Sequence, residues 1–72
     1  MKNKDLLVIC QYNYNMWGDI DWKLFHGKKL LMEGCSSNED FLKSDAAYWV
    51  EDILKTNDCE IEFKKGRLRV NN

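Results

Sequence analysis

Hydrophobic and polar residues alternate with two different periods along the chain. Residues 6–10 are all apolar, and Gln11 to Tyr14 then alternate between amide and aromatic side chains. A short run that is apolar on both faces is typical of a central strand covered on both sides. Alternation returns at residues 20–24, and Gly27 separates them from a short stretch at residues 29–33 whose three central residues are apolar. We predict a strand over 5–14 and a hairpin over 20–33, although this second part also fits a helix broken at Gly27.

A helix is predicted in the middle of the chain. The sequence Ser-Ser-Asn-Glu at 36–39 fits a capping box, in which the Ser36 hydroxyl accepts from a helical N–H and Glu39 reaches back to the cap. Apolar residues at helical spacing follow, namely Leu42, Ala46, Trp49, Val50 and Ile53. Asn57, which tolerates the left-handed conformation, is expected just beyond the end. This pattern predicts an amphipathic helix from about Asn38 to Lys55.

The C-terminal residues alternate again and predict a second hairpin, with Gly66 in its turn. One face of this hairpin is expected to be apolar, with Cys59, Ile61, Phe63, Leu68 and Val70. The other is expected to be charged, with Glu60, Glu62, Arg67 and Arg69. The predicted fold class is α+β: a small antiparallel sheet of four or five strands with one amphipathic helix across one face, in the order β-β-β-α-β-β. Residues 1–72 form a single domain.

The composition describes one small domain and excludes a two-domain enzyme. The chain has 72 residues, of which 44% are hydrophobic, and nine of them are Trp, Tyr or Phe. A domain of this length buries only about 60% of its unfolded surface. One helix covers one face of a sheet, whereas the first strand is apolar on both faces. Some apolar surface is therefore left over, and we expect another protein, or a second copy in a homodimer, to cover it.

Charge and cysteine content indicate a cytoplasmic protein. The net charge is −1, but residues 36–58 carry −4 between mildly basic ends. Cys10, Cys35 and Cys59 are odd in number and form no CxxC motif, so we interpret them as reduced thiols. The apolar run at residues 6–10 is too short for a signal peptide or a membrane span. We expect a cytoplasmic location without membrane association.

Residues that could support catalysis or bind a metal are few. His26 is the only histidine and lies in a predicted turn. Asp19 and Asp21 could hold Mg²⁺, but such sites recruit further carboxylates or phosphates, and a turn and a solvent-facing strand position also explain them. Cys35, Cys59 and His26 are a conceivable metal site. No GxxxxGKS, GxGxxG, HExxH or GxSxG motif occurs. We therefore predict a protein that is not an enzyme and has no cofactor.

Two groups of residues have the composition of protein-binding surfaces. The first is the stretch 11–19, which joins large aromatic side chains to small amides. The second is a row on the helix at residues 41, 45, 48 and 52, where aromatic rings and carboxylates would suit a basic cleft. The candidate partner-binding residues are Tyr12, Tyr14, Trp17, Asp45, Tyr48 and Asp52. The alternatives are that the rings of the first group belong to the core and that the row is a solvated flank.

Binding of single-stranded nucleic acid is the second function class. It needs aromatic platforms and a basic groove. The residues that would supply them are Tyr12, Tyr14, Lys28, Lys29, Lys64 and Arg67. Glu60 and Glu62 would face the two C-terminal arginines and neutralise them, so we favour a protein partner over nucleic acid.

In size and composition the chain resembles the small proteins of bacteria and their phages, including inhibitors of host defence nucleases such as anti-CRISPR proteins. The resemblance covers no particular stretch of the sequence and assigns no residue. It implies a small binding protein that inhibits or modulates a larger macromolecular machine.

Overall fold

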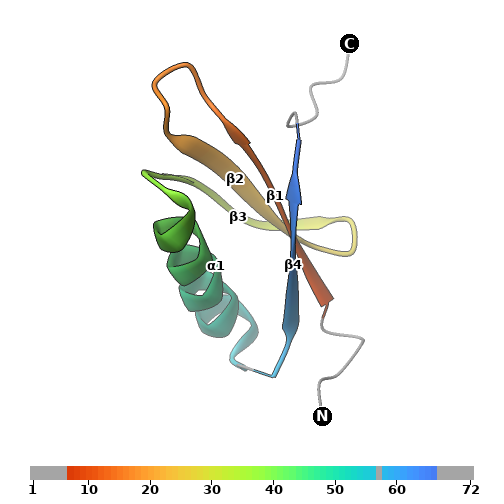
Figure 1. Cartoon of the computed structure of the whole chain (residues 1–72). Helices are drawn as coiled ribbons and strands as arrows, with labels where there is room; N and C mark the ends of the chain where they lie inside the picture. Colours follow the sequence, from red (N-terminus) through yellow and green to blue (C-terminus); the bar gives the residue numbers. More distant parts are fainter. Residues whose placement is uncertain (1–6, 57, 67–72) are drawn as a thin grey trace.

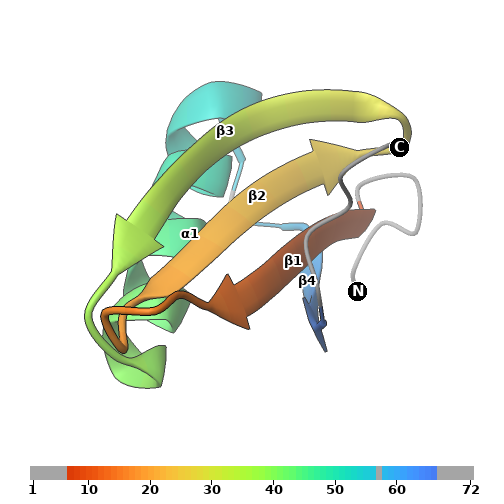
Figure 2. The same ribbon diagram turned by 90° about the horizontal axis from the view of Figure 1, so that it is seen from above.

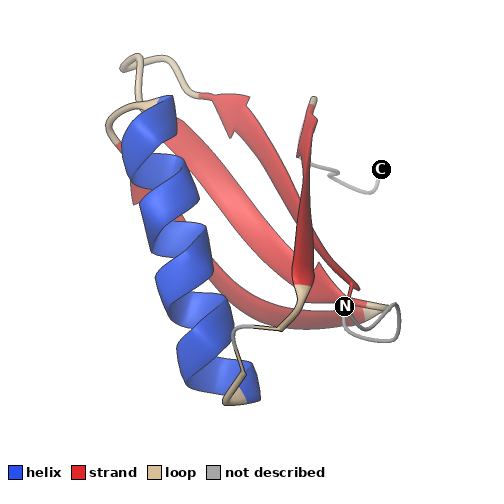
Figure 3. Cartoon of the chain, turned by 60° about the horizontal axis from the view of Figure 1, so that its bottom comes forward, coloured by secondary structure: helices blue, strands red, loops and turns tan. Residues whose placement is uncertain are grey.

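Four strands and one helix make up the part of the chain that the computed structural model describes, residues 7–56 and 58–66 (Figure 1). The elements are β1 (Leu7–Tyr14), β2 (Ile20–His26), β3 (Lys29–Ser36), α1 (Glu39–Leu54) and β4 (Glu60–Lys65). The strands form one sheet in the order β3-β2-β1-β4, and α1 packs on one side of it (Figure 3). The α+β class predicted from the sequence is confirmed.

The first three strands form a meander of antiparallel hairpins. β1 pairs with β2, and β2 pairs with β3, with a β-bulge opposite Leu24 and Phe25. Gly27 has a φ of 65° in the β2–β3 turn, which is the left-handed conformation that glycine adopts without strain. The predicted hairpin over residues 20–33 is confirmed, and the alternative of a helix broken at Gly27 is wrong.

The last strand pairs with β1 in parallel, so the sheet is not wholly antiparallel. Because β2 is antiparallel to both neighbours, β1, β3 and β4 all run in the same direction. A parallel connection needs a crossover, and α1 supplies it between β3 and β4. The sheet is strongly twisted (Figure 2). The predicted fifth strand at residues 67–70 lies outside the described residues.

Helix α1 begins two residues later than the capping box predicts. Its N-cap is Asn38, whose side-chain oxygen accepts a hydrogen bond from the N–H of Phe41 at 2.9 Å. Ser36 is instead the last residue of β3. The helix ends at a left-handed Lys55, which bonds to the carbonyl oxygen of Glu51 at 2.9 Å. The predicted bounds are thus right within a residue, whereas the predicted capping box is wrong.

The core lies between α1 and the sheet, with the helix packed mainly over β3 and β2. The buried hydrophobic residues are Val8, Cys10, Ile20, Trp22, Leu24, Leu42, Ala46 and Val50. On the opposite face of β1, Leu7 is exposed and Ile9 is half-buried, and no described element covers them. The prediction that this strand is central is confirmed, but its predicted cover on both faces is wrong for the described residues. None of the described helical segments is long and apolar enough to cross a membrane.

Candidate functional site

The turn between β1 and β2 is organised by the side chain of Asn15. Its amide oxygen accepts hydrogen bonds from the backbone N–H groups of Trp17 at 2.9 Å and Asp19 at 3.1 Å, and its Nδ2 donates to Asp21 at 3.2 Å. Backbone bonds from Asn15 to Asp19 and from Gly18 to Asn15 close the loop. A three-residue hairpin loop needs a left-handed residue at its last position. Gly18 occupies that position with a φ of 85°. The turn therefore has one well-defined backbone conformation.

The tip of this turn carries two apolar side chains that lie almost entirely in solvent. Met16 is 86% exposed and Trp17 is 79% exposed. Both project from the backbone that the hydrogen bonds of Asn15 hold in place. We call residues 15–19 the aromatic turn. Tryptophan is among the residues that most often dominate the binding energy of protein interfaces.

Tyr14, the last residue of β1, joins three elements beside the aromatic turn. Its hydroxyl donates to Oε2 of Glu39, in the first turn of α1, at 2.7 Å. The Nζ atom of Lys65, at the end of β4, lies 5.1 Å from the centre of the Tyr14 ring. The hydrogen bond to Glu39, followed by desolvation, raises the pKa of the Tyr14 hydroxyl. Tyr14 is thus a structural junction that supports the turn.

This junction is expected to weaken in alkaline solution. The pKa of Tyr14 is raised in the folded state. The hydrogen bond from its hydroxyl therefore adds fully to the free energy of unfolding below the ordinary tyrosine pKa of about 10. This stabilisation is lost as the pH rises through the folded-state pKa. The difference in melting temperature between the wild type and Tyr14→Phe should therefore shrink at high pH. Tyr48→Phe leaves the bond to Glu39 intact and is the control. A difference that stays constant with pH would contradict the assignment.

Tyr12 is partly buried against the core and does not lie at the exposed tip of the turn. It lies on the helix side of β1, where it pairs with Trp22 of β2 and Lys65 of β4. Its side chain is half-buried and packs against the core cluster. The three aromatic residues proposed from the sequence thus have different environments: Tyr12 packs against the core, Tyr14 joins β1 to α1 and β4, and Trp17 is exposed.

The row on the helix at residues 41, 45, 48 and 52 also contains side chains in different environments. Phe41, Tyr48 and Asp52 are exposed, as the sequence hypothesis requires. Asp45 instead accepts a hydrogen bond at 2.6 Å from the hydroxyl of Ser36. That hydroxyl accepts one at 2.9 Å from the indole N–H of Trp22. Asp45 therefore ends a hydrogen-bond chain into the core, which is a structural role that the sequence did not predict.

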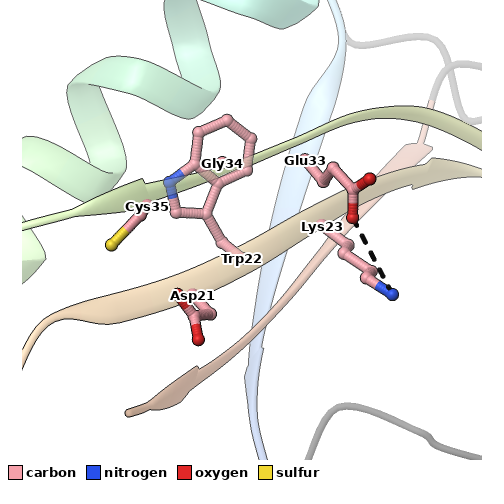
Figure 4. Close-up of a pocket in the computed structure, with 6 residues that line it drawn as sticks. All are labelled: Asp21, Trp22, Lys23, Glu33, Gly34 and Cys35. Carbon is pink, nitrogen blue, oxygen red and sulfur yellow. Dashed lines mark ion pairs between the residues drawn. The ribbon is translucent and has the colours of Figure 1, made fainter. Parts of the chain in front are cut away.

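A shallow depression of about 450 Å³ lies between β2 and β3 on the uncovered face of the sheet (Figure 4). It is lined by Asp21, Trp22, Lys23, Glu33, Gly34 and Cys35. Nζ of Lys23 is 3.9 Å from Oε1 of Glu33. Desolvation is the main cause that raises the pKa of the Cys35 thiol, and a hydrogen bond with Asp21 raises it further. This thiol is consequently protonated at neutral pH and is a poor nucleophile.

The structure separates the basic residues of the nucleic-acid hypothesis. Lys28 lies in the β2–β3 turn and Lys29 is the first residue of β3, both near the start of β1, since Ile9 pairs with Phe25. Lys64 lies near the end of β4, which pairs with the end of β1. Arg67 lies outside the described residues. Lys28 and Lys29 are thus separated along the sheet from Lys64, and these three described lysines share no groove.

The candidate metal ligands are also apart. His26 and Cys35 lie at opposite ends of the β2–β3 hairpin. Across residues 7–56 and 58–66, no three His, Cys, Asp or Glu side chains are grouped to hold a metal ion. Asp21 accepts from Asn15, and the backbone of Asp19 closes the aromatic turn.

Two residues that shape the aromatic turn, Asn15 and Met16, are not among the candidate binding residues predicted from the sequence. Met16 lies within the stretch that sequence analysis singled out, but its chemistry alone does not distinguish it from a core residue. Asn15 precedes a turn that contains Gly18, and asparagine often bonds to the backbone of such turns. This signal identifies the turn but not the exposure of its tip.

Comparisons of the chain with protein families, with characterised proteins and with solved structures found no match. The function is therefore argued from the geometry of the described residues.

Proposed function

We propose that this protein is a non-enzymatic binding module that contacts another protein through the aromatic turn. The observation that carries the proposal is the exposure of Met16 and Trp17 at the tip of a turn fixed by Asn15. Exposed apolar residues scattered singly need no explanation. Met16 and Trp17 are two large apolar side chains next to each other on a turn of fixed backbone conformation. Their exposure to solvent does not stabilise the free protein, which makes such a pair unusual.

The rigidity of the turn favours binding energetically. Ordering a flexible side chain or loop on association costs free energy, and a segment already held in one conformation avoids most of that cost. Asn15 fixes the backbone of the turn before a partner arrives. Tyr14 ties the adjacent end of β1 to α1. The free energy gained by burying the Trp17 indole is then available for affinity.

Trp17→Ala is expected to weaken partner binding at least about tenfold, the effect typical of a tryptophan at the centre of an interface. The same change should leave the free energy of unfolding within about 0.5 kcal/mol, because the side chain makes few contacts in the free protein. The measurement is quantitative affinity capture from the native host with tagged wild type and variant. The partner identified in this way is then titrated against both by calorimetry.

Leu30→Ala is the matched control, since it removes another exposed apolar side chain, from β3 at some distance from the turn. A captured protein that is lost with Trp17→Ala and retained with Leu30→Ala supports the proposal. Equal binding by Trp17→Ala and the wild type would refute it. Sedimentation of the purified chain shows whether the partner at the turn is a second copy, in which case Trp17→Ala dissociates the dimer.

Inhibition or modulation of a larger machine stays a prediction that depends on the identity of this partner. Single-stranded nucleic-acid binding is the alternative. Titration of a labelled oligonucleotide at two salt concentrations separates the two, since submicromolar affinity with a steep salt dependence requires several phosphate contacts. The separation of Lys28 and Lys29 from Lys64 supports the protein partner.

A further inference from the structure

The charges of the described residues are divided unequally between the two layers. From Ser36 to Asp58, α1 and its connections carry two lysines and six carboxylates, a net charge of −4. The described strands and their turns carry five lysines and five carboxylates and are neutral. The side of α1 that faces away from the sheet (Figure 3) therefore belongs to an acidic layer.

We call this side the outer face of α1. It includes the exposed residues Asp40, Phe41, Tyr48, Glu51 and Asp52. The buried residues Leu42, Ala46 and Val50 mark the opposite side of the helix. Phe41 and Tyr48 are seven residues apart, or about two helical turns, so both rings lie on the same side. Their exposures are 56% and 61%.

The ring of Tyr48 is held in position beside a carboxylate. It packs edge-on against Trp49, with ring centres 5.0 Å apart at 82°, while most of it stays in solvent. Asp52 follows one turn later and is therefore its neighbour on the helix surface. Neither Glu51 nor Asp52 has an ion-pair partner among the described residues. An aromatic ring and two carboxylates that form no ion pair with a described residue thus lie together.

We propose that the outer face of α1 binds an arginine-rich segment of a partner protein. A guanidinium group stacks on an aromatic ring and forms paired hydrogen bonds with a carboxylate. Tyr48 and Asp52 offer this combination one helical turn apart, and Glu51 adds a second acidic contact. A lysine ammonium gains the charge attraction without the planar stacking, so the surface distinguishes arginine from lysine.

The proposal rests on the protein-binding function proposed above, but it concerns a different surface from the aromatic turn. The test uses two peptides, deca-arginine and deca-lysine, titrated at low salt into the isotope-labelled full chain and followed by NMR. The amide shifts should concentrate on residues 40–52. Deca-arginine should bind at least about threefold more tightly than deca-lysine, as expected for stacking on an exposed ring.

Two charge-reversal variants provide a matched comparison. Glu51→Lys with Asp52→Lys should weaken deca-arginine binding at least about tenfold. Glu60→Lys with Glu62→Lys makes the same change in net charge on exposed residues of β4, and should weaken binding less than about threefold because distant charges are screened. Tyr48→Ala should weaken it about three- to fivefold. All substituted residues are exposed, and the NMR spectrum of each variant verifies its fold.

Three results would overturn the proposal: equal losses from the two charge reversals, equal affinity for both peptides, or shifts concentrated on β4. Trp17→Ala should leave deca-arginine binding unchanged, since the turn lies outside the outer face. Failure of the peptide to bind would therefore refute arginine binding by the outer face of α1. It would not bear on protein binding by the aromatic turn. Loss of partner binding in Trp17→Ala is likewise independent of the peptide result.

Discussion

Gly34→Ala is expected to destabilise the protein by about 3 kcal/mol, which for a domain of this size lowers the melting temperature by roughly 12–24 °C. Gly34 pairs with Trp22 across β2 and β3. A Cβ atom at this position would lie 2.6 Å from Cζ2 of the Trp22 ring and 3.1 Å from two further ring atoms. The indole would have to move, although its N–H bonds to the buried hydroxyl of Ser36.

Gly66→Ala is the matched control, because a Cβ there would meet no atom of the described residues within 4 Å and the residue needs no left-handed backbone. It should change the free energy of unfolding by less than about 0.5 kcal/mol. Thermal and chemical unfolding measure both variants. Gly34→Ala should also cost much less in a Trp22→Phe background, where the clashing atoms are absent. The same cost in both backgrounds would show that the ring is not responsible.

Asp45→Ala should cost about 2 kcal/mol of folding free energy, because hydrogen bonds to charged groups contribute more than neutral ones. Asp45 is the acceptor at the end of the chain that runs from Trp22 through Ser36. Its removal leaves the Ser36 hydroxyl buried without this acceptor. Asp45→Asn keeps an acceptor oxygen and should cost less than half as much. Urea unfolding of the purified variants gives these free energies.

Asp52→Ala separates this structural role from the general effect of removing a carboxylate from α1. Asp52 is exposed and has no ion-pair partner in the described part of the chain, so the change should stay within about 0.5 kcal/mol. Equal stability of Asp45→Ala and Asp52→Ala would mean that the hydrogen-bond chain contributes nothing. In that case Asp45 would be available for a partner, as the sequence alone suggested.

Sequence periodicity predicts the elements whose buried residues recur at the regular spacing of a helix or a strand. Leu42, Ala46 and Val50 are buried because they recur at the helical period, and Ile20, Trp22 and Leu24 because they alternate. A local pattern does not determine which of two nearby polar residues caps a helix. Ser36 and Asn38 both have suitable side chains. The Ser36 hydroxyl is hydrogen-bonded to Trp22, which is distant in the sequence, and Asn38 caps the helix instead.

The direction of β4 also depends on a non-local arrangement. Alternation at residues 59–63 predicts a strand, and the structure has one there. Its parallel pairing follows from the course of α1, which returns the chain to the starting end of β1. The burial of Tyr12 depends in turn on β4 and β2 on either side of it. The aromatic stretch 11–19 is visible in the sequence, whereas its division into core, junction and exposed tip requires the assembled sheet.

The parallel pairing of β1 with β4 has a consequence for how the protein is made. Val8 pairs with Ile61, so the first strand meets its second neighbour only after β4 has been synthesised. The meander and α1 involve closer neighbours in the sequence and can form earlier, because closing a short loop loses less entropy. Until β4 arrives, β1 is an open edge with unpaired backbone groups, which is a known starting point for aggregation. We therefore expect nascent chains, or chains shortened before β4, to aggregate more readily than chains that contain this strand.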